Sequence, residues 1–304
     1  MSESKTSEDQ TSRAGFFFAL SAFLIWGCLA LYWKATSHVD AVEVTMHRVI
    51  WSLPVAGVIL WFMGRTNDIL PTLKSPRKLA ILFFTSLLIS FNWGVFIWAI
   101  SVDRTLEAAM AYYINPLMSV AMGAIFLRER FNKLQLVAIL IALLAVIVLT
   151  VMQGVLPWIS LSLALTFALY ALIRKMVDVG PTQGFLVEVI LIYPISVAYM
   201  VWLIAQEQLV FGNSDNLDVM LLMCAGPATA VPLILYANGA KRLRMSTIGM
   251  MQYIAPTMIF LIGIFVFKEE LKHPQVIAFV LIWIALAIYS WSLFAGKSKQ
   301  KKTT

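Results

Sequence analysis

The sequence predicts an all-helical (all-α) membrane protein with ten transmembrane helices, arranged as two inverted five-helix repeats. Three observations lead to this fold class. The composition is too apolar for a water-soluble domain, ten apolar segments have the length of a membrane span, and short motifs recur at one fixed distance along the chain. The first observation indicates the class, the second the number of helices, and the third their arrangement.

The composition is that of a chain folded in lipid. Of its 304 residues, 61% are hydrophobic and 13% are charged, whereas soluble domains are about 45–50% apolar and about 25% charged. A chain of about 300 residues buries only about 75% of its surface on folding, so a water-soluble fold would leave much apolar surface in water. The bilayer is therefore the expected solvent of most of the chain.

Ten segments are long and apolar enough to cross a bilayer, which takes about 20 residues of helix. They cover residues 14–33, 42–63, 79–100, 107–127, 134–152, 155–173, 184–205, 218–240, 246–267 and 274–294. None alternates between apolar and polar residues as the strands of a membrane barrel do. The predicted organisation is a tail at 1–13, a first five-helix unit at 14–152, a second at 155–294, and a basic tail at 295–304.

The positive charges indicate the orientation, because Lys and Arg collect in short cytoplasmic loops. With the N-terminus inside, most of the 23 Lys and Arg residues fall on the cytoplasmic side. The external connections contain only Lys34, Arg104, Lys268 and Lys272. Both termini are therefore expected in the cytoplasm, with the chain in the inner or plasma membrane. The net charge of +7 is explained by this orientation and does not indicate binding to nucleic acid.

An internal repeat relates residues 140 positions apart. The matching pairs are Tyr113 to Pro116 with Tyr253 to Pro256, Glu129 with Glu269, Pro54 with Pro194, and Arg48 opposite Glu188. Because each half contains five spans, an odd number, the second copy enters the membrane from the opposite side. Inverted repeats are common in secondary transporters, whose solute sites lie near the bilayer midplane between the repeats.

Enzyme signatures are absent from the sequence. It contains no HExxH, GxSxG or P-loop motif and no cluster of His and Cys with metal-ligand spacing. ATP hydrolysis by this chain alone is therefore excluded, and no catalytic residue, cofactor or metal is expected. A membrane-embedded enzyme or a non-transporting sensor is the alternative function, although the sequence contains neither a nucleophile–base pair nor a soluble output domain.

Charged residues inside spans are unfavourable in lipid and are therefore candidate gating or coupling residues. Arg48, preceded by His47, lies near the outer side of the second span, where Glu107 at the start of the fourth could pair with it. Glu188 enters from the inner side. Its expected partners are Arg174, Lys175 or Arg244. Two interpretations stay open: gating pairs or solute contacts on each side, and static ion pairs near the interface.

Prolines at matched positions predict similar kinks in two spans. Pro116 and Pro256 occupy equivalent places in the fourth and ninth spans, and proline removes a backbone hydrogen bond and bends a helix. The bends could belong to moving parts of a transporter, or they could be static kinks that improve packing.

Polar and aromatic residues at mid-depth predict a solute pocket, since interfacial aromatic residues belong at span ends. Packing by small residues explains part of the pattern. A sparsely polar, aromatic-walled pocket would suit a neutral, amphipathic or zwitterionic solute, or a cation held over the rings. The candidate solute-binding residues are Trp26, Asn92, Trp93, Tyr112, Tyr113, Asn115, Tyr236 and Gln252.

Six segments carry a family signature over nearly the whole chain. They are EVTMHRVIWS (43–52), NWGVFIWAI (92–100), LEAAMAYYINPL (106–117), FLRERF (126–131), LRMSTIG (243–249) and QYIAPT (252–257). Together they resemble the RarD proteins, in the EamA-type branch of the drug/metabolite transporter (DMT) superfamily. The resemblance implies ten helices, two EamA repeats, cytoplasmic termini and solute transport, and the family name is associated with chloramphenicol sensitivity.

The expected function is that of a secondary transporter. It would export small metabolites or drugs by alternating access between the two five-helix halves. A gradient of protons, of another ion, or of the solute itself would drive it. The expected partners are a small-molecule solute and the lipid bilayer.

Overall fold

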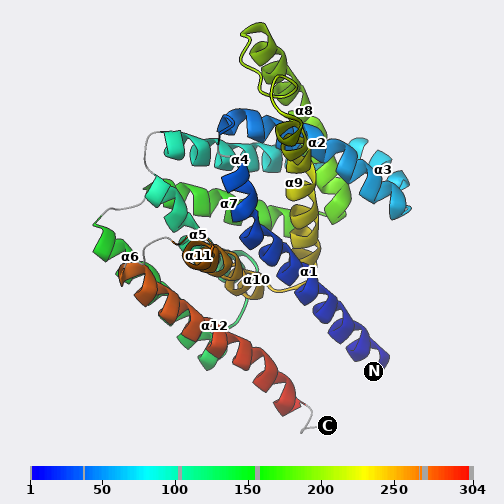
Figure 1. The fold of residues 1–304 in the computed structure, drawn as a ribbon. Helices are drawn as coiled ribbons and strands as arrows, with labels where there is room; N and C mark the ends of the chain where they lie inside the picture. The colour runs from blue at the N-terminus through cyan, green and yellow to red at the C-terminus, as the bar shows by residue number, and fades with distance from the viewer. Residues whose placement is uncertain are drawn as a thin grey trace.

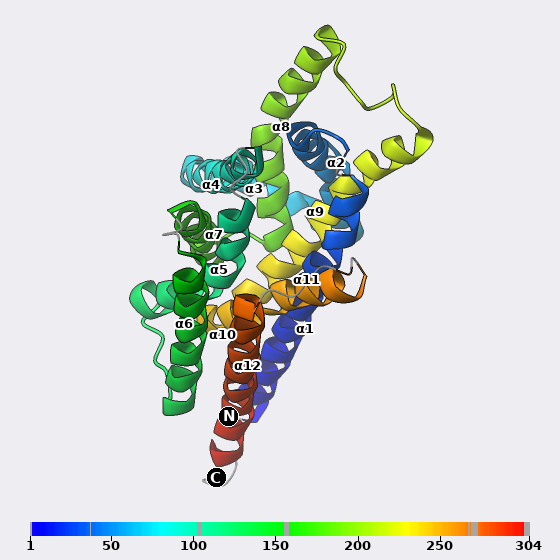
Figure 2. The same cartoon turned by 60° about the vertical axis from the view of Figure 1, so that its left-hand side comes forward.

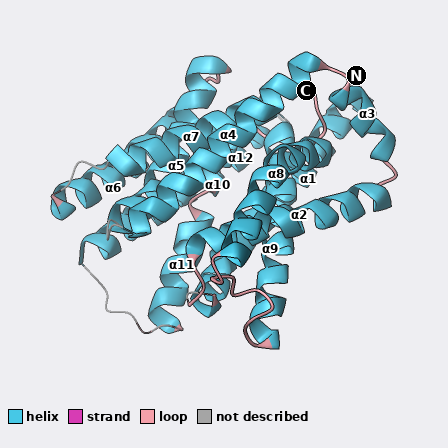
Figure 3. Ribbon diagram, turned by 90° about the horizontal axis from the view of Figure 1, so that it is seen from above, coloured by secondary structure: helices cyan, strands magenta, loops and turns pink. Residues whose placement is uncertain are grey.

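The computed structural model describes residues 2–36, 38–101, 105–154, 158–266, 268 and 273–300. Every regular element in these ranges is a helix (Figures 1 and 3). The longer helices are α1 (Ser2–Ala35), α2 (Ala41–Phe62), α4 (Pro76–Ser101), α5 (Thr105–Phe126), α6 (Lys133–Gln153), α7 (Trp158–Met176), α8 (Pro181–Ala205), α9 (Asn216–Arg242), α11 (Ile254–Phe265) and α12 (His273–Gln300). The short ones are η1 (Thr66–Asp68), α3 (Ile69–Leu73) and α10 (Met245–Met251).

The expected multi-pass helical membrane protein is confirmed. Seven of the described helices are long and apolar enough to cross a membrane, and three shorter apolar stretches lie in α1, α5 and α12. Each of the ten predicted segments overlaps a described helix, with the ninth divided between α10 and α11. The arrangement of ten spans as two inverted repeats stays a prediction.

Local sequence explains several helix ends. The Asp40 side chain accepts hydrogen bonds from the amides of Val42 and Glu43 at the start of α2. Asn132 and Gln135 form a reciprocal capping box at the start of α6. Gly154, at a φ of 72°, ends the same helix in the left-handed conformation that glycine adopts without strain.

The faces of α6 have the character of a helix packed in lipid. Its small residues Ala138, Ala142 and Ala145 are buried and pack against α12 in one cluster. Its large residues face outward, among them Leu136, Leu140, Leu143, Leu144 and Ile147. Small residues let two helices approach closely in a membrane, while large apolar side chains face the lipid tails.

Contacts between helices relate the two predicted halves. Helix α6 lies against α12 (Figures 1 and 2), α2 against α8, and α5 against α10, which are equivalent positions in the two halves. Other contacts also exchange with one another: α1 with α9 corresponds to α7 with α4, α5 with α7 to α11 with α1, and α2 with α9 to α8 with α4. The start of α1 and the end of α12 lie at the same end of the molecule (Figure 2).

The two matched prolines do not shape their helices alike. Helix α5 continues through Pro116. The ninth predicted span instead breaks at Gln252 and Tyr253, and Pro256 lies in the first turn of α11, where its missing N–H is not needed. The Pro116 carbonyl is packed against Gly249 of α10, so close that a Cβ there would lie 2.6 Å from the oxygen.

Gly226 of α9 is expected to tolerate no larger residue. A Cβ at this position would lie 2.3 Å from the carbonyl carbon of Trp51 in α2, and backbone atoms have little freedom to move. Overpacking of this kind destabilises proteins by about 1–3 kcal/mol. Gly226→Ala should lower the unfolding temperature of the purified protein. Gly57→Ala is the matched control, because a Cβ there would meet no atom within 4 Å.

Candidate functional site

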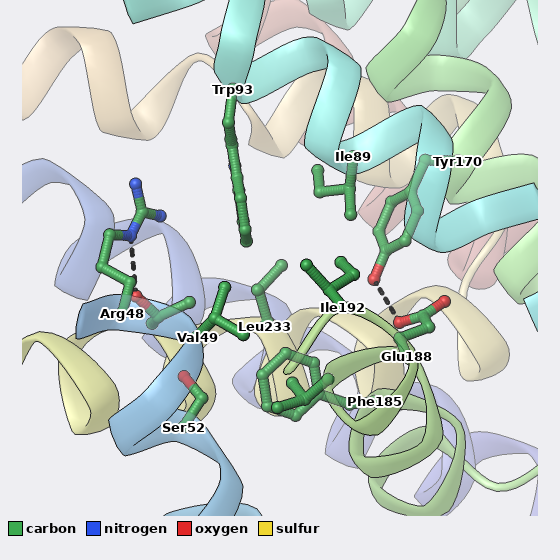
Figure 4. A pocket seen from close by; sticks show the side chains of 12 residues that line it. Arg48, Val49, Ser52, Ile89, Trp93, Tyr170, Phe185, Glu188, Ile192 and Leu233 are labelled. Carbon is green, nitrogen blue, oxygen red and sulfur yellow. Dashed lines mark hydrogen bonds between the residues drawn. The ribbon is translucent and has the colours of Figure 1, made fainter. Parts of the chain in front are cut away.

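A cavity lies between α2, α4, α7, α8 and α9 (Figure 4). Its free space is about 20 Å³, which holds about one water molecule, whereas sites for drug-sized ligands measure about 300–1,000 Å³. The site is therefore nearly closed in this conformation. The lining residues are Arg48, Val49, Ser52, Ile89, Trp93, Tyr170, Phe185, Glu188, Val189, Ile192, Thr229 and Leu233.

Most of the lining residues come in pairs that lie 140 positions apart, the distance of the internal repeat. The pairs are Arg48 with Glu188, Val49 with Val189, Ser52 with Ile192, Ile89 with Thr229, and Trp93 with Leu233. The same distance separates Tyr253 from Tyr113, whose carbonyl accepts a hydrogen bond of 3.1 Å from the Tyr253 hydroxyl. Two repeats related by an axis through the cavity would produce this pairing.

Arg48 forms one end of the cavity. Its Nε donates a hydrogen bond of 2.9 Å to the Thr229 hydroxyl of α9, and its guanidinium lies 4.6 Å from the centre of the Trp93 ring of α4. A cation over the face of Trp is attracted by the electrons of the ring. Three helices of both predicted halves therefore hold one cationic side chain at the cavity wall.

Glu188 forms the other end. Its Oε1 accepts a hydrogen bond of 2.5 Å from the Thr85 hydroxyl and its Oε2 one of 3.2 Å from the Tyr170 hydroxyl. The Nε of Arg174 lies 3.4 Å from Oε1, and both side chains are almost fully buried. Arg174 was one of three expected partners of Glu188, and this pairing is confirmed.

Apolar side chains separate the two ends. Leu233, Ile192 and Phe185 lie between Arg48 and Glu188 (Figure 4). The cavity thus presents a cationic group and a carboxylate across an apolar middle, an arrangement able to orient a small amphipathic molecule.

The other two expected partners of Glu188 lie elsewhere. The Lys175 ammonium donates hydrogen bonds to the carbonyls of Ala240 and Leu243, at the end of α9. Arg244 lies beside Glu129, with 3.5 Å between Nε and Oε2. Long cationic side chains near helix ends bind free carbonyls and loop carboxylates in this way.

Trp26 and Tyr236, both predicted to bind solute, lie in an aromatic cluster outside the cavity. Their rings are 5.4 Å apart, and Phe23 and Phe167 pack around them. The cluster joins α1, α7 and α9. The structure thus places these two rings in helix packing, next to the cavity residue Tyr170, which contacts Phe167.

Asn92 and Tyr112 are not among the residues that line the cavity, although Tyr112 lies close enough to Arg48 to interact with its charge. The Asn92 amide donates hydrogen bonds to the Leu163 carbonyl (2.8 Å) and the Thr166 hydroxyl (2.9 Å), which tie α4 to α7. Tyr112 is 41% exposed, with its ring 6.5 Å from that of Phe96.

Tyr113, Asn115 and Gln252 lie at the contact between α5 and the α10–α11 pair. The Gln252 amide donates a hydrogen bond of 2.9 Å to the Ser119 hydroxyl, and the Tyr113 ring packs on Phe279. The buried Oδ1 of Asn115 accepts no hydrogen bond from the described residues. Of the eight predicted solute-binding residues, the structure places Trp93 at the cavity.

His47 and Glu107 complete the predicted gating group. The His47 ring accepts a hydrogen bond of 3.2 Å from the Trp51 indole, and its Nε2 lies 3.8 Å from Glu43. Glu107 belongs to α5, but its side chain lies outside the described residues. The expected pairing of Arg48 with Glu107 therefore stays a prediction.

Comparison with known proteins identifies the family. The EamA-like transporter family matches residues 13–151. The chain is 38% identical to an uncharacterized transporter, YojE, of Bacillus subtilis, over 95% of this chain and 98% of that one. It is 36% identical to a protein RarD of Streptomyces exfoliatus, over 93% and 90%. The chain belongs to the RarD family of EamA-like transporters. It is therefore a multi-pass membrane transporter by family.

A solved structure supports the fold of this RarD family member. It is 17% identical in sequence and superposes with a TM-score of 0.73, over 92% of this chain and 98% of that one. At that identity the likeness concerns the fold alone.

Three residues that bond to Glu188 or Arg48 in this RarD family chain were not among the predicted site residues: Tyr170, Thr85 and Thr229. Tyr170 lies four residues before Arg174, one of the predicted partners of Glu188, so the two share the face of α7 that meets Glu188. The four-residue spacing could have predicted that Tyr170 also contacts Glu188. The sequence did not predict the contacts of Thr85 and Thr229, because a threonine in an apolar helix can bond to its own backbone instead.

Proposed function

We propose that this chain exports a small solute by alternating access, and that the cavity between α2, α4, α7, α8 and α9 is its binding site. The observation that carries the proposal is the pairing of lining residues 140 positions apart. In transporters built from inverted repeats, the solute binds where the repeats meet, near the bilayer midplane.

The narrowness of the cavity supports a closed conformation within such a cycle. A space of about 20 Å³ admits a solute only after the surrounding helices move apart. Alternating access supplies this movement, since one repeat rocks against the other around a fixed site.

The cavity lining suggests what kind of solute would fit. Arg48 offers a cationic contact beside an indole face, Glu188 offers a carboxylate, and the wall between them is apolar. We propose a small amphipathic solute with a polar or anionic group at Arg48. Chloramphenicol is a suitable first probe, because the family name is associated with it.

We further propose that the transporter lies in the cell membrane with both termini in the cytoplasm, as the distribution of Lys and Arg favours. Arg48 and Glu188 would act at the solute site, and Glu188 could couple transport to a gradient of protons or another ion.

The proposal is tested by filling the cavity. The protein is reconstituted in liposomes, and exchange of labelled for unlabelled solute is measured with chloramphenicol and a metabolite library. Ile192→Trp should abolish the exchange shown by the wild type, because the indole would occupy the cavity. Ile195→Trp, three residues along α8 and 64% exposed, is the matched control and should leave exchange intact.

Two results would contradict the proposal. One is exchange that survives Ile192→Trp in a protein that elutes as a folded species. The other is the absence of exchange in the wild type across the whole library, which would favour the enzyme or sensor alternative.

A further inference from the structure

Two carboxylates of the first half, each with little exposed surface, hold backbone amides of the second half. They are Glu43, in the first turn of α2, and Glu129, in the connection after α5, whose side chain is 8% exposed. Each joins parts of the chain more than 100 residues apart. Neither lines the cavity.

Glu43 is only 1% exposed. Its Oε1 accepts hydrogen bonds from the amides of Val210 (3.0 Å) and Phe211 (3.1 Å), in the segment between α8 and α9. The Phe211 ring then packs on the His47 ring at 4.7 Å and lies 6.1 Å from Trp51. The Glu43 carboxylate thereby holds the Phe211 ring of the second half against α2.

Glu129 makes the corresponding contact with α10. Its Oε1 accepts a hydrogen bond of 2.6 Å from the Met245 amide, and its Oε2 accepts from the amide and the hydroxyl of Ser246. Arg244 adds its charge at 3.5 Å. All seven residues of α10 are buried, so this carboxylate ties a buried helix of the second half to the end of α5.

The two contacts belong to opposite sides of the membrane. Between Glu43 and Glu129 the chain passes through α2, α4 and α5. In the proposed topology these are three spans, an odd number, so Glu43 lies at the outer side and Glu129 at the inner side. Both contacts are made in this structure, whose cavity is nearly closed.

We propose that Glu43 and Glu129 are the latches of the outer and inner gates, each holding one side of the cavity closed. This inference rests on the proposed transport through the cavity. Each latch consists of a few hydrogen bonds to one carboxylate. Such bonds are stronger than neutral ones, yet they can break as a unit when the carboxylate leaves its amides. Opening of one latch while the other holds would expose the cavity to one side only.

A latch and a contact that only stabilises the fold, here called a staple, differ in the effect of removing them. Loss of a latch makes the cavity accessible from one side, whereas loss of a staple loosens the fold and exposes the cavity from both. Access can be measured without knowing the solute. Ser52 lines the cavity and is fully buried, so Ser52→Cys supplies a reporter thiol. Cys28→Ser and Cys224→Ser remove the two exposed natural thiols.

The reporter is treated with a membrane-impermeant, trimethylammonium-bearing thiol reagent in inside-out and right-side-out vesicles. Glu129→Leu should raise the labelling rate by at least about tenfold from the cytoplasmic side alone, and Glu43→Leu from the external side alone. Asp178→Asn and Glu207→Gln are the matched controls, because these exposed carboxylates make no contact with an amide of the other half among the described residues. Their labelling should equal that of the wild type.

Two smaller changes test the same contacts in case the leucine variants misfold. Gly123→Ala leaves Glu129 in place but sets a Cβ 3.0 Å from its Oε2 and from the Met245 Cβ, so it should weaken the inner latch. Glu43→Gln keeps one carbonyl oxygen facing the two amides and should give a rate between the wild type and Glu43→Leu.

Unchanged labelling in all four variants, or a rise from both sides together, would overturn the latches. The proposed transport is judged separately by solute exchange. If the wild type exchanges solute but the latch variants show no one-sided labelling, only the latch proposal is rejected. If the latch variants show one-sided labelling but the wild type exchanges no solute, the transport proposal is rejected and the gates remain.

Discussion

Arg174→Met is expected to destabilise the protein more than any other single change considered. Arg174 is 2% exposed, its Nε lies 3.4 Å from the Glu188 carboxylate, and its Nη2 donates a hydrogen bond of 2.8 Å to the Pro181 carbonyl. Removing one member of a buried ion pair costs about 3–5 kcal/mol, because the remaining charge is left buried without its counter-ion. The expected result is a large fall in unfolding temperature, read by thermal unfolding of the purified protein.

The double variant provides the decisive control. Arg174→Met with Glu188→Leu removes both charges and leaves apolar groups of similar volume, which is often neutral for stability. It should recover most of the lost unfolding temperature. Lys78→Met breaks the exposed pair with Asp178, 3.2 Å apart, and should change stability by less than about 1 kcal/mol. A double variant as unstable as Arg174→Met would show that the pair is not the source of the effect.

Arg48→Ala is expected to reduce transport strongly while leaving the protein folded in the membrane. The variant removes the cationic end of the cavity, its hydrogen bond to Thr229 and its contact with the Trp93 ring. A hydrogen bond to a charged group contributes about 1.5–3 kcal/mol, so solute exchange should fall by at least about tenfold. Exchange in proteoliposomes, normalised to the amount of folded protein, measures the loss.

Two comparisons show whether charge or geometry matters at this position. Arg48→Lys keeps the charge but loses the planar group that stacks on Trp93, so it should recover exchange only in part. Arg65→Ala removes a half-exposed arginine that pairs with Asp68 outside the cavity, and it should exchange as the wild type does. Unchanged exchange in Arg48→Ala would remove Arg48 from the mechanism.

The sequence by itself determined the class of this protein, because lipid restricts what a spanning segment can be. A span must satisfy its own backbone hydrogen bonds, which a helix of about 20 apolar residues does. The helices therefore follow from local composition, and so does the function class, through motifs that match the RarD family. The repeat distance of 140 residues was also readable, and it recurs in the pairs that line the cavity. Even the partner of Glu188 was among the expected ones, since Arg174 lies in the last turn of the preceding helix.

Only the tertiary structure decided which mid-depth residues meet. Polarity and aromaticity give the depth of a residue but not the rotation of its helix, which is set by close packing at small residues such as Gly226 and Gly249. Trp26 and Tyr236 therefore lie in helix packing, while Trp93 faces the cavity. The contacts of Glu43 and Glu129 likewise depend on backbone amides far along the chain. A backbone amide has no signature in the sequence, so folding alone reveals which carboxylate it binds.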